Sequence, residues 1–168
     1  LGGLTMNLHL PPSSGDNFLR ILGYEHDSRL GKTVSPAGDF NGDGRSDIVI
    51  GAPYADKGLT IDVGVAYIIF GFSGPYVDLD LETFTTGVRG VKIEGWQNSG
   101  FLGLALCAMG DLNQDGISDV GIGMPGSSAD GRGDETGEVL IIFGSTSIRI
   151  SDINYSELLV TPSLGYRI

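Results

Sequence analysis

Residues 39–47 read Asp-Phe-Asn-Gly-Asp-Gly-Arg-Ser-Asp, and residues 111–119 read Asp-Leu-Asn-Gln-Asp-Gly-Ile-Ser-Asp. Both stretches follow the pattern Asp-x-Asn-x-Asp-Gly-x-x-Asp, and they begin 72 residues apart. Neighbouring segments recur at the same spacing: Leu30-Gly31 as Leu102-Gly103, and Gly51-Ala52-Pro53 as Gly123-Met124-Pro125. Such a period is typical of a repeat architecture, in which each copy is one supersecondary unit.

The segments around these two loops predict β-strands. Residues 47–51 and 63–70 are short apolar runs rich in β-branched and aromatic residues, and glycine, proline or aspartate bounds each of them. Apolar and polar residues alternate at 77–81 and 148–151, which indicates edge strands with one exposed face. A helical turn is expected only at residues 80–84 and 156–159. Each unit should therefore hold three or four strands, in an all-β protein.

Three flanking segments alternate with the two cores, and they end in similar short strands at 19–23, 91–95 and 166–168. The chain thus divides, within a single repeat domain, into a flank at 1–23, a first unit at 24–95 and a second unit at 96–168 that includes the start of a third flank. A unit of ~70 residues with about four strands cannot bury both faces of its sheet alone, so neighbouring units should stack like propeller blades. Two blades make a partial propeller, to be completed by a longer protein or by assembly.

The composition excludes several classes of protein. The chain has 168 residues, 28 of them glycine, with a formal net charge of −11, and its 10 lysines and arginines are scattered. Binding of nucleic acid through its phosphates is therefore not expected. The longest uncharged apolar run, residues 63–72, is about half the length of a membrane-spanning helix, so no span is predicted. The chain starts at Leu1 without an apolar leader, as expected for a mature or excised product.

Few residues suit a catalytic site. Cys107 is the one cysteine, and its apolar surroundings at 104–109 predict a buried structural thiol. His9 and His26 are the two histidines, and neither lies near a repeated acidic motif, which disfavours a zinc site or a histidine-based triad. Tyr24 and Trp96 follow equivalent glycines, where packing between blades or stacking on a sugar are the alternatives. We expect a protein that is not an enzyme.

The two Asp-rich loops have the chemistry of a calcium site. Positions 1, 3 and 5 aim side-chain oxygens at one centre, the glycine at position 6 permits a sharp turn, a backbone carbonyl at position 7 can face inward, and the aspartate at position 9 closes the cage. Hard oxygen ligands in a flexible loop favour Ca²⁺, with Mg²⁺ as the alternative. The loops lack the position-12 glutamate of an EF-hand and lie between strands, so we expect β-hairpin loops without flanking helices. Catalytic use of the metal is disfavoured, because the loop itself supplies most of the ligands.

The chain resembles the FG-GAP repeat of integrin α-subunit propellers. The resemblance rests on Leu30-Gly31, on the Asp-rich loop, on residues 47–53 and on Ala66-Tyr67-Ile68-Ile69-Phe70-Gly71. Met124 departs from the alanine of the Gly-Ala-Pro element, and family propellers commonly have seven blades. The resemblance implies that each unit is one blade, that each loop binds Ca²⁺ and that the protein is an extracellular or cell-surface adhesion module.

Two Ca²⁺ sites follow from the match, one in each loop. Each would use four side chains and one backbone carbonyl. The ligand residues are Asp39, Asn41, Asp43, Arg45 (carbonyl) and Asp47 in the first loop, and Asp111, Asn113, Asp115, Ile117 (carbonyl) and Asp119 in the second.

Three classes of function stay open. The leading one is a calcium-binding extracellular structural or adhesion module that contacts proteins or cell surfaces; the others are a repeating subunit of a surface fibre or filament, and a propeller lectin or carbohydrate-active enzyme. Arg132-Gly133-Asp134 matches a tripeptide that integrins bind, with a solvated turn as the alternative, and Asn154-Tyr155-Ser156 is an acceptor pattern for an attached glycan. The unclosed repeat predicts two exposed ends, and hence protein partners or head-to-tail copies of the chain in a ring or filament.

Overall fold

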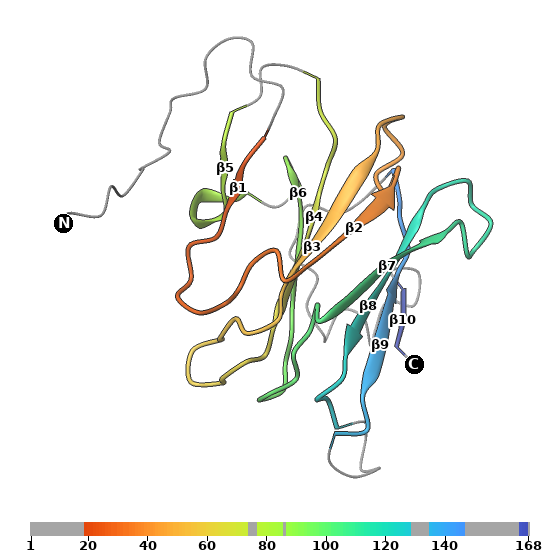
Figure 1. Ribbon diagram of the computed structural model, residues 1–168. Helices are drawn as coiled ribbons and strands as arrows, with labels where there is room; N and C mark the ends of the chain where they lie inside the picture. Colours follow the sequence, from red (N-terminus) through yellow and green to blue (C-terminus); the bar gives the residue numbers. More distant parts are fainter. Residues whose placement is uncertain (1–18, 74–76, 86, 129–134, 147–164, 168) are drawn as a thin grey trace, which may run out of the picture.

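The computed structural model of the chain describes residues 19–73, 77–85, 87–128, 135–146 and 165–167, with side chains throughout except at 165–167. Two four-stranded antiparallel sheets make up most of this part (Figure 1). No α-helix occurs in these ranges, and their one 3-10 turn is η1 (Leu81–Thr83). The prediction of an all-β chain built from two blade-like sheets is confirmed.

Each sheet follows the same strand order along the chain. The first sheet has the order β2-β3-β4-β6, and the second has β7-β8-β9-β10. The bounds are β2 (Thr33–Gly38), β3 (Asp47–Ala52), β4 (Val65–Ile69), β6 (Gly90–Glu94), β7 (Ala105–Gly110), β8 (Asp119–Met124), β9 (Glu138–Ile142) and β10 (Gly165–Arg167).

A bulge leads from the first strand of each sheet into the Asp-rich loop. The register of β2 on β3 shifts between Pro36 and Gly38, and that of β7 on β8 shifts between Ala108 and Gly110. Both glycines have φ +68°, a left-handed conformation that other residues seldom adopt. The bulge and the glycine together bend the strand out of the sheet, so the loop leaves both sheets in the same way.

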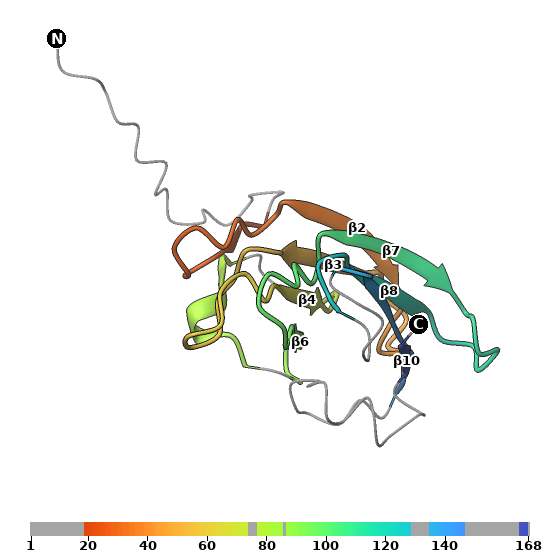
Figure 2. The same ribbon diagram turned by 90° about the horizontal axis from the view of Figure 1, so that it is seen from below.

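The two sheets pack face to face over a shared apolar core. Val49, Ile68 and Val91 lie in register on one face of the first sheet, and all three are fully buried. They pack in one cluster with residues of the second sheet, among them Val120, Ile122, Leu140 and Ile142. Strands β2 and β7 run side by side at one edge of this arrangement (Figure 2). We call the cluster the inter-sheet core.

A small layer covers the other face of the first sheet. Strands β1 (Ile21–Leu22) and β5 (Leu79–Asp80) pair in parallel, and η1 follows β5. Figure 1 shows this layer on the side away from the second sheet. We call residues 19–30 and 77–85 the cap. Its apolar side chains Leu30, Leu79, Leu81 and Phe84 pack on the buried residues Ile50, Tyr67 and Ile69 of the first sheet.

The outer face of the second sheet is exposed along β7 and at Val139 of β9, whereas Ile141 on the same face is buried. Met109 is 36% exposed and Val139 is 43% exposed. A Cβ atom on Gly121 would lie 3.0 Å from Cys107 Sγ and 3.0 Å from Met109 Sδ, so these side chains share the face. We call the surface formed by Ala105, Cys107, Met109, Gly121 and Val139 the open face. Among the described residues, the cap covers the outer face of the first sheet, whereas that of the second sheet is partly exposed.

Two sequence predictions need correction. Cys107 is exposed rather than buried, because alternation along β7 directs it to the open face while Leu106 packs on the inter-sheet core. The edge strand expected at 77–81 is limited to Leu79–Asp80, because Asp80 caps η1 by accepting a hydrogen bond from the Glu82 backbone N–H. The helical turn expected at 80–84 is confirmed as η1. The strand expected at 148–151 and the turn expected at 156–159 lie outside the described residues.

Candidate functional site

The two Asp-rich loops lie at the same end of the molecule, at the upper right of Figure 1. The first loop (residues 39–47) joins β2 to β3, and the second loop (residues 111–119) joins β7 to β8. Each loop turns sharply at glycine, with φ +84° at Gly44 and +89° at Gly116. The expectation of loops between strands, without flanking helices, is confirmed.

Side-chain oxygens of the first loop converge on its own backbone. The backbone N–H of Asp43 donates to Asp39 Oδ1 at 2.9 Å and to Asn41 Oδ1 at 3.0 Å. Asp39 Oδ2 accepts from the Gly44 N–H at 2.9 Å, and Asp43 Oδ1 accepts from the Arg45 N–H at 2.9 Å. These bonds hold the side chains of positions 1, 3 and 5 around one centre.

The second loop repeats this hydrogen-bond set. The Asp115 N–H donates to Asp111 Oδ1 at 2.9 Å and to Asn113 Oδ1 at 3.1 Å. The Gly116 N–H donates to Asp111 Oδ2 at 2.8 Å, and the Ile117 N–H donates to Asp115 Oδ1 at 2.9 Å. Two loops that differ in sequence at three of nine positions thus take the same conformation, which follows from the aspartates, the asparagine and the glycine that they share.

The aspartate at position 9 has a different role from the side chains at positions 1, 3 and 5. Asp47 is 1% exposed, and its carboxylate accepts from the backbone N–H groups of Phe40 at 2.8 Å, Asn41 at 3.3 Å and Gly71 at 2.7 Å. Asp119 is fully buried and accepts in the same way from Leu112 and Gly144. Each aspartate therefore ties its loop to the end of the sheet's third strand. Such multiple acceptance stabilises a buried carboxylate that would otherwise be costly.

The charge state of the first loop follows from these contacts. The Asn41 side-chain amide donates to Asp43 Oδ2 at 3.1 Å, and this bond, aided by Arg45, lowers the pKa of Asp43. Burial raises the pKa of Asp47, although the N–H groups of Gly71, Phe40 and Asn41 oppose that effect. Asp43 is thus favoured in the anionic form that a cation requires.

The structure brings together positions 1, 3 and 5 of each predicted site and holds position 9 against the backbone. Because asparagine fills position 3 and the position-9 carboxylate is engaged with N–H groups, the described residues contain no set of three acidic, histidine or cysteine side chains arranged around a metal ion.

The residues present nevertheless fit a hard divalent cation. A carboxylate oxygen has two lone pairs, so Asp39 Oδ1 and Asp43 Oδ1 each retain one after accepting a single N–H. The Asn41 carbonyl oxygen also retains one. Two carboxylates and an amide oxygen of this kind are ligands that Ca²⁺ prefers. A cation there would offset the repulsion between Asp39 and Asp43.

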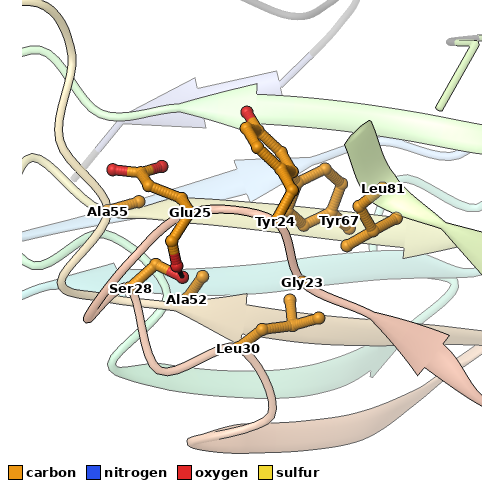
Figure 3. Close-up of a pocket in the computed structure, with 9 residues that line it drawn as sticks. All are labelled: Gly23, Tyr24, Glu25, Ser28, Leu30, Ala52, Ala55, Tyr67 and Leu81. Atoms are coloured by element: carbon orange, nitrogen blue, oxygen red, sulfur yellow. Dashed lines mark hydrogen bonds between the residues drawn. The ribbon is translucent and has the colours of Figure 1, made fainter. Parts of the chain in front are cut away.

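One small cavity lies under the cap, and no motif in the sequence predicts it. Figure 3 shows its lining, drawn from the cap and from the first sheet: Gly23, Tyr24, Glu25, Ser28, Leu30, Ala52, Ala55, Tyr67 and Leu81. Its volume of about 10 Å³ suits a single water molecule rather than an organic ligand. Burial, together with Tyr24, raises the pKa of the Tyr67 phenol, so that group stays neutral.

Other sequence motifs fall partly or wholly outside the described residues. Arg132-Gly133-Asp134 and Asn154 lie outside them, so both remain predictions. Trp96 packs against the inter-sheet core as expected, whereas the equivalent Tyr24 is 49% exposed. The described residues include no helix long and apolar enough to cross a membrane.

Comparisons with a family model and with known proteins agree on one family. Residues 31–69 match the FG-GAP repeat. The chain is 39% identical over 127 residues to phosphatidylinositol-glycan-specific phospholipase D of Rattus norvegicus, a match that covers 74% of this chain and 14% of that protein. It is 32% identical over 132 residues to integrin alpha-IIb of Homo sapiens, covering 76% of this chain and 11% of the integrin. It is 30% identical over 131 residues to integrin alpha-7 of Mus musculus, covering 76% and 10%. The chain thus spans 14% or less of the length of these relatives.

Proposed function

The chain belongs to the FG-GAP repeat family, and we propose that it is a calcium-binding extracellular module that makes protein or cell-surface contacts and catalyses no reaction. The observation that carries this proposal is the identical hydrogen-bond set of the two loops. That set keeps paired carboxylates and an amide oxygen converged in both copies. Order of this kind in a strongly acidic loop is costly unless a cation offsets the charge.

The chemistry of the loops supports a structural role for the metal. The candidate ligands of each site all come from one loop, and the position-9 aspartates Asp47 and Asp119 tie the loop to its sheet. When bound, a Ca²⁺ ion supplies positive charge and up to eight oxygen-coordination positions. The loop residues hold it, and through Asp47 or Asp119 they connect it to the sheet. We propose Asp39, Asn41, Asp43 and Asp47, with the carbonyl of Arg45, as the first site, and the equivalent residues as the second.

A melting experiment tests the calcium proposal. Each site should add about 2.7 kcal/mol to the free energy of unfolding when free Ca²⁺ is about 100 times the dissociation constant. Chelation should therefore lower the Tm, and Mg²⁺ at the same concentration should restore less of it. Asp43→Ala combined with Asp115→Ala should remove most of the difference.

The matched control removes two negative charges outside the loops. Asp27→Asn with Glu82→Gln alters two exposed acidic residues, and asparagine tolerates the left-handed backbone at position 27, where φ is +58°. This variant should retain the full calcium response. A Tm that is the same in calcium and in excess chelator for the unaltered protein would refute the proposal.

We further propose that the open face receives a protein partner. It presents apolar side chains, including Met109 and Val139, in the positions that the first sheet buries against the second. A second copy of the chain, presenting its cap, is the partner expected in a fibre or ring. Light scattering tests whether the partner is a second copy. A folded 17.6 kDa monomer at high concentration would exclude self-assembly and leave a different protein as the partner.

A further inference from the structure

Asn41 and Gly42 form the one Asn-Gly pair in the sequence, and they occupy positions 3 and 4 of the first loop. Asparagine is a thermolabile residue. The backbone nitrogen of the following residue can attack its side-chain carbonyl carbon, and glycine favours this attack because it has no side chain to obstruct it and few limits on its backbone. The second loop carries Asn113 followed by Gln114. The repeat therefore offers a labile pair in one loop and a matched, hindered pair in the other.

The backbone nitrogen of Gly42 differs from its neighbours in having no partner. The N–H of Asn41 donates to Asp47 Oδ2 at 3.3 Å. The N–H of Asp43 donates to Asp39 Oδ1 and to Asn41 Oδ1. Within the ranges that the structure describes, no hydrogen bond engages the N–H of Gly42. Gly42 is also exposed, so water reaches this peptide unit and its nitrogen is available for reaction.

The side chain of Asn41 is held over that peptide unit. Asn41 Oδ1 accepts from the Asp43 N–H at 3.0 Å, and Asn41 Nδ2 donates to Asp43 Oδ2 at 3.1 Å. These bonds span Gly42 and curl the side chain toward the Gly42 nitrogen. The Asp43 N–H would also stabilise the negative charge that develops on Oδ1 during the attack, in the manner of an oxyanion-hole donor.

Aspartate followed by glycine can form the same ring, and each loop has such a pair at positions 5 and 6. Here the glycine nitrogens are engaged. The N–H of Gly44 donates to Asp39 Oδ2 at 2.9 Å, and that of Gly116 donates to Asp111 Oδ2 at 2.8 Å. A nitrogen whose N–H is held by a carboxylate is less available for attack, so the hydrogen bonds of the loops single out Asn41.

We propose that Asn41 is a site of spontaneous deamidation, and that its isoaspartate product weakens the first cation site. The Gly42 nitrogen bonds to Asn41 Cγ, the bond from Cγ to Nδ2 breaks, and the side-chain nitrogen leaves as ammonia with the proton from the Gly42 nitrogen, which water carries. Water then opens the five-membered succinimide ring. Opening at Cγ gives an ordinary aspartate, and opening at the backbone carbonyl carbon gives isoaspartate, in which the main chain runs through the former side chain.

The effect on the cation rests on the proposed calcium function. Isoaspartate adds a methylene group to the main chain and attaches its carboxylate directly to Cα. The oxygen of position 3 is thereby displaced from the centre that it shares with Asp39 and Asp43. Loss of a supporting partner commonly costs a metal site about 10–100-fold in affinity, and loss of a ligand oxygen should cost at least as much.

Peptide mass spectrometry tests the deamidation with no metal involved. The unaltered protein is incubated in excess chelator at mildly alkaline pH, below its Tm. The peptide that carries Asn41 should gain one mass unit with time and become a substrate for an isoaspartate-specific methyltransferase, whereas the peptide that carries Asn113 should stay largely unchanged. Gln114→Gly should make Asn113 react at a rate similar to that of Asn41, since glycine tolerates the φ of +63° at position 114.

Three results would overturn the deamidation site. If Asn41 gains mass in denaturant but not in the native protein, the fold protects the pair. Equal rates at Asn41 and Asn113 in the unaltered protein would show that the glycine has no part in the reaction. An unreactive Asn113 in the Gln114→Gly variant would show that the shared loop conformation does not promote it.

Calorimetry tests the effect on the cation. In the Asp115→Ala background only the first loop should bind calcium, so its affinity can be measured before and after incubation. The incubated protein, enriched in isoaspartate, should bind about 10–100-fold more weakly. Repair by the methyltransferase with its methyl donor should restore most of the affinity, because it returns the residue to an ordinary aspartate.

The outcomes separate this inference from the proposed function. Unchanged calcium affinity after conversion of Asn41 to isoaspartate would overturn the effect on the cation. If the fresh unaltered protein binds no calcium, the proposed function is wrong and the effect on the cation falls with it, while the mass measurement still decides whether Asn41 deamidates.

Discussion

The first and second sheets carry equivalent residues in opposite environments. Ala66 in the first sheet is fully buried, whereas its counterpart Val139 in the second is 43% exposed. Phe40 is 1% exposed and Leu112 is 48% exposed. The larger apolar side chain is thus the exposed one at β9, although valine is more hydrophobic than alanine. Burial in this chain is set by which side has a neighbouring sheet.

The comparison also separates two kinds of contact in the loops. The hydrogen bonds that the side chains of positions 1, 3 and 5 make within a loop are the same in both copies, because they depend on residues that both copies carry. Contacts beyond the loop differ, because the carbonyl oxygens of Asp39 and Phe40 accept from Ser118 and Ser145 of the second unit, whereas no backbone hydrogen bond among the described residues reaches those of Asp111 and Leu112. The conformation of each loop therefore follows from the repeated residues, whereas the stability of the fold depends on packing between neighbouring sheets.

A charge placed in equivalent positions of the two sheets should give the largest difference in the free energy of unfolding. Ala66→Asp places an unpaired carboxylate in the inter-sheet core, which should cost about 3–5 kcal/mol of the free energy of unfolding. Val139→Asp puts the same charge on the open face, where water solvates it, and should cost about 1 kcal/mol through lost strand propensity. Chemical denaturation of both variants in calcium measures the difference. Equal losses would show that the outer face of the second sheet is also sealed.

Substitutions at position 2 of the loops, Phe40 and Leu112, should change the free energy of unfolding less. Phe40→Leu leaves unfilled space in the inter-sheet core and should cost about 1 kcal/mol. Leu112→Phe enlarges an exposed side chain and should be close to neutral. Thermal melts of the two single variants provide the measurement, and a larger loss from Leu112→Phe would contradict the assigned environments.

An ion-pair cluster on the outer strand of the first sheet should respond to pH. Burial opposes ionisation of Glu94, but Lys57 Nζ at 2.7 Å and Lys92 Nζ at 2.6 Å outweigh it and lower the pKa of Glu94. The two ion pairs of Glu94 therefore contribute fully to the free energy of unfolding above the pKa of unfolded glutamate, about 4.3. It is lost as the pH falls through the lower folded pKa.

Glu94→Gln should accordingly cost about 0.5–1 kcal/mol at neutral pH. The loss should vanish in acid, where Glu94 is protonated in both states. Denaturation curves at a series of pH values measure it. A loss that is constant from neutral pH to acid would show that the glutamate acts by packing alone.

Labelling of Cys107 should have the smallest effect on stability. The thiol lies on the open face, so a small alkylating reagent should modify it in the native state at a rate comparable to that in denaturant. The Tm should hardly change, because no core contact is lost. Strong protection of the thiol at low protein concentration would contradict an exposed face, and protection that grows with concentration would indicate self-association.

Sequence reasoning predicted the repeated features because they depend on local chemistry. The period, the β-strands, the hairpin loops and the shared Asp and Asn positions all followed from residue types at fixed spacing. It was wrong about Cys107, because an apolar run does not show which residues alternate toward a neighbouring sheet and which toward solvent. It also did not indicate that β1 and β5 cap one face, since parallel pairing of two-residue strands far apart in the chain leaves no periodic signal.

By itself, the sequence determined the unit: a four-stranded sheet with an Asp-rich loop, written twice. Side-chain oxygens, glycines and β-branched residues act over a few positions, so their effect can be read in order along the chain. Only the tertiary structure decided that Phe40 is enclosed while Leu112 is exposed, and that Gly42 lies against Thr146 while Gln114 is exposed. Those differences arise from contacts between residues far apart in sequence, and identical local patterns cannot encode them.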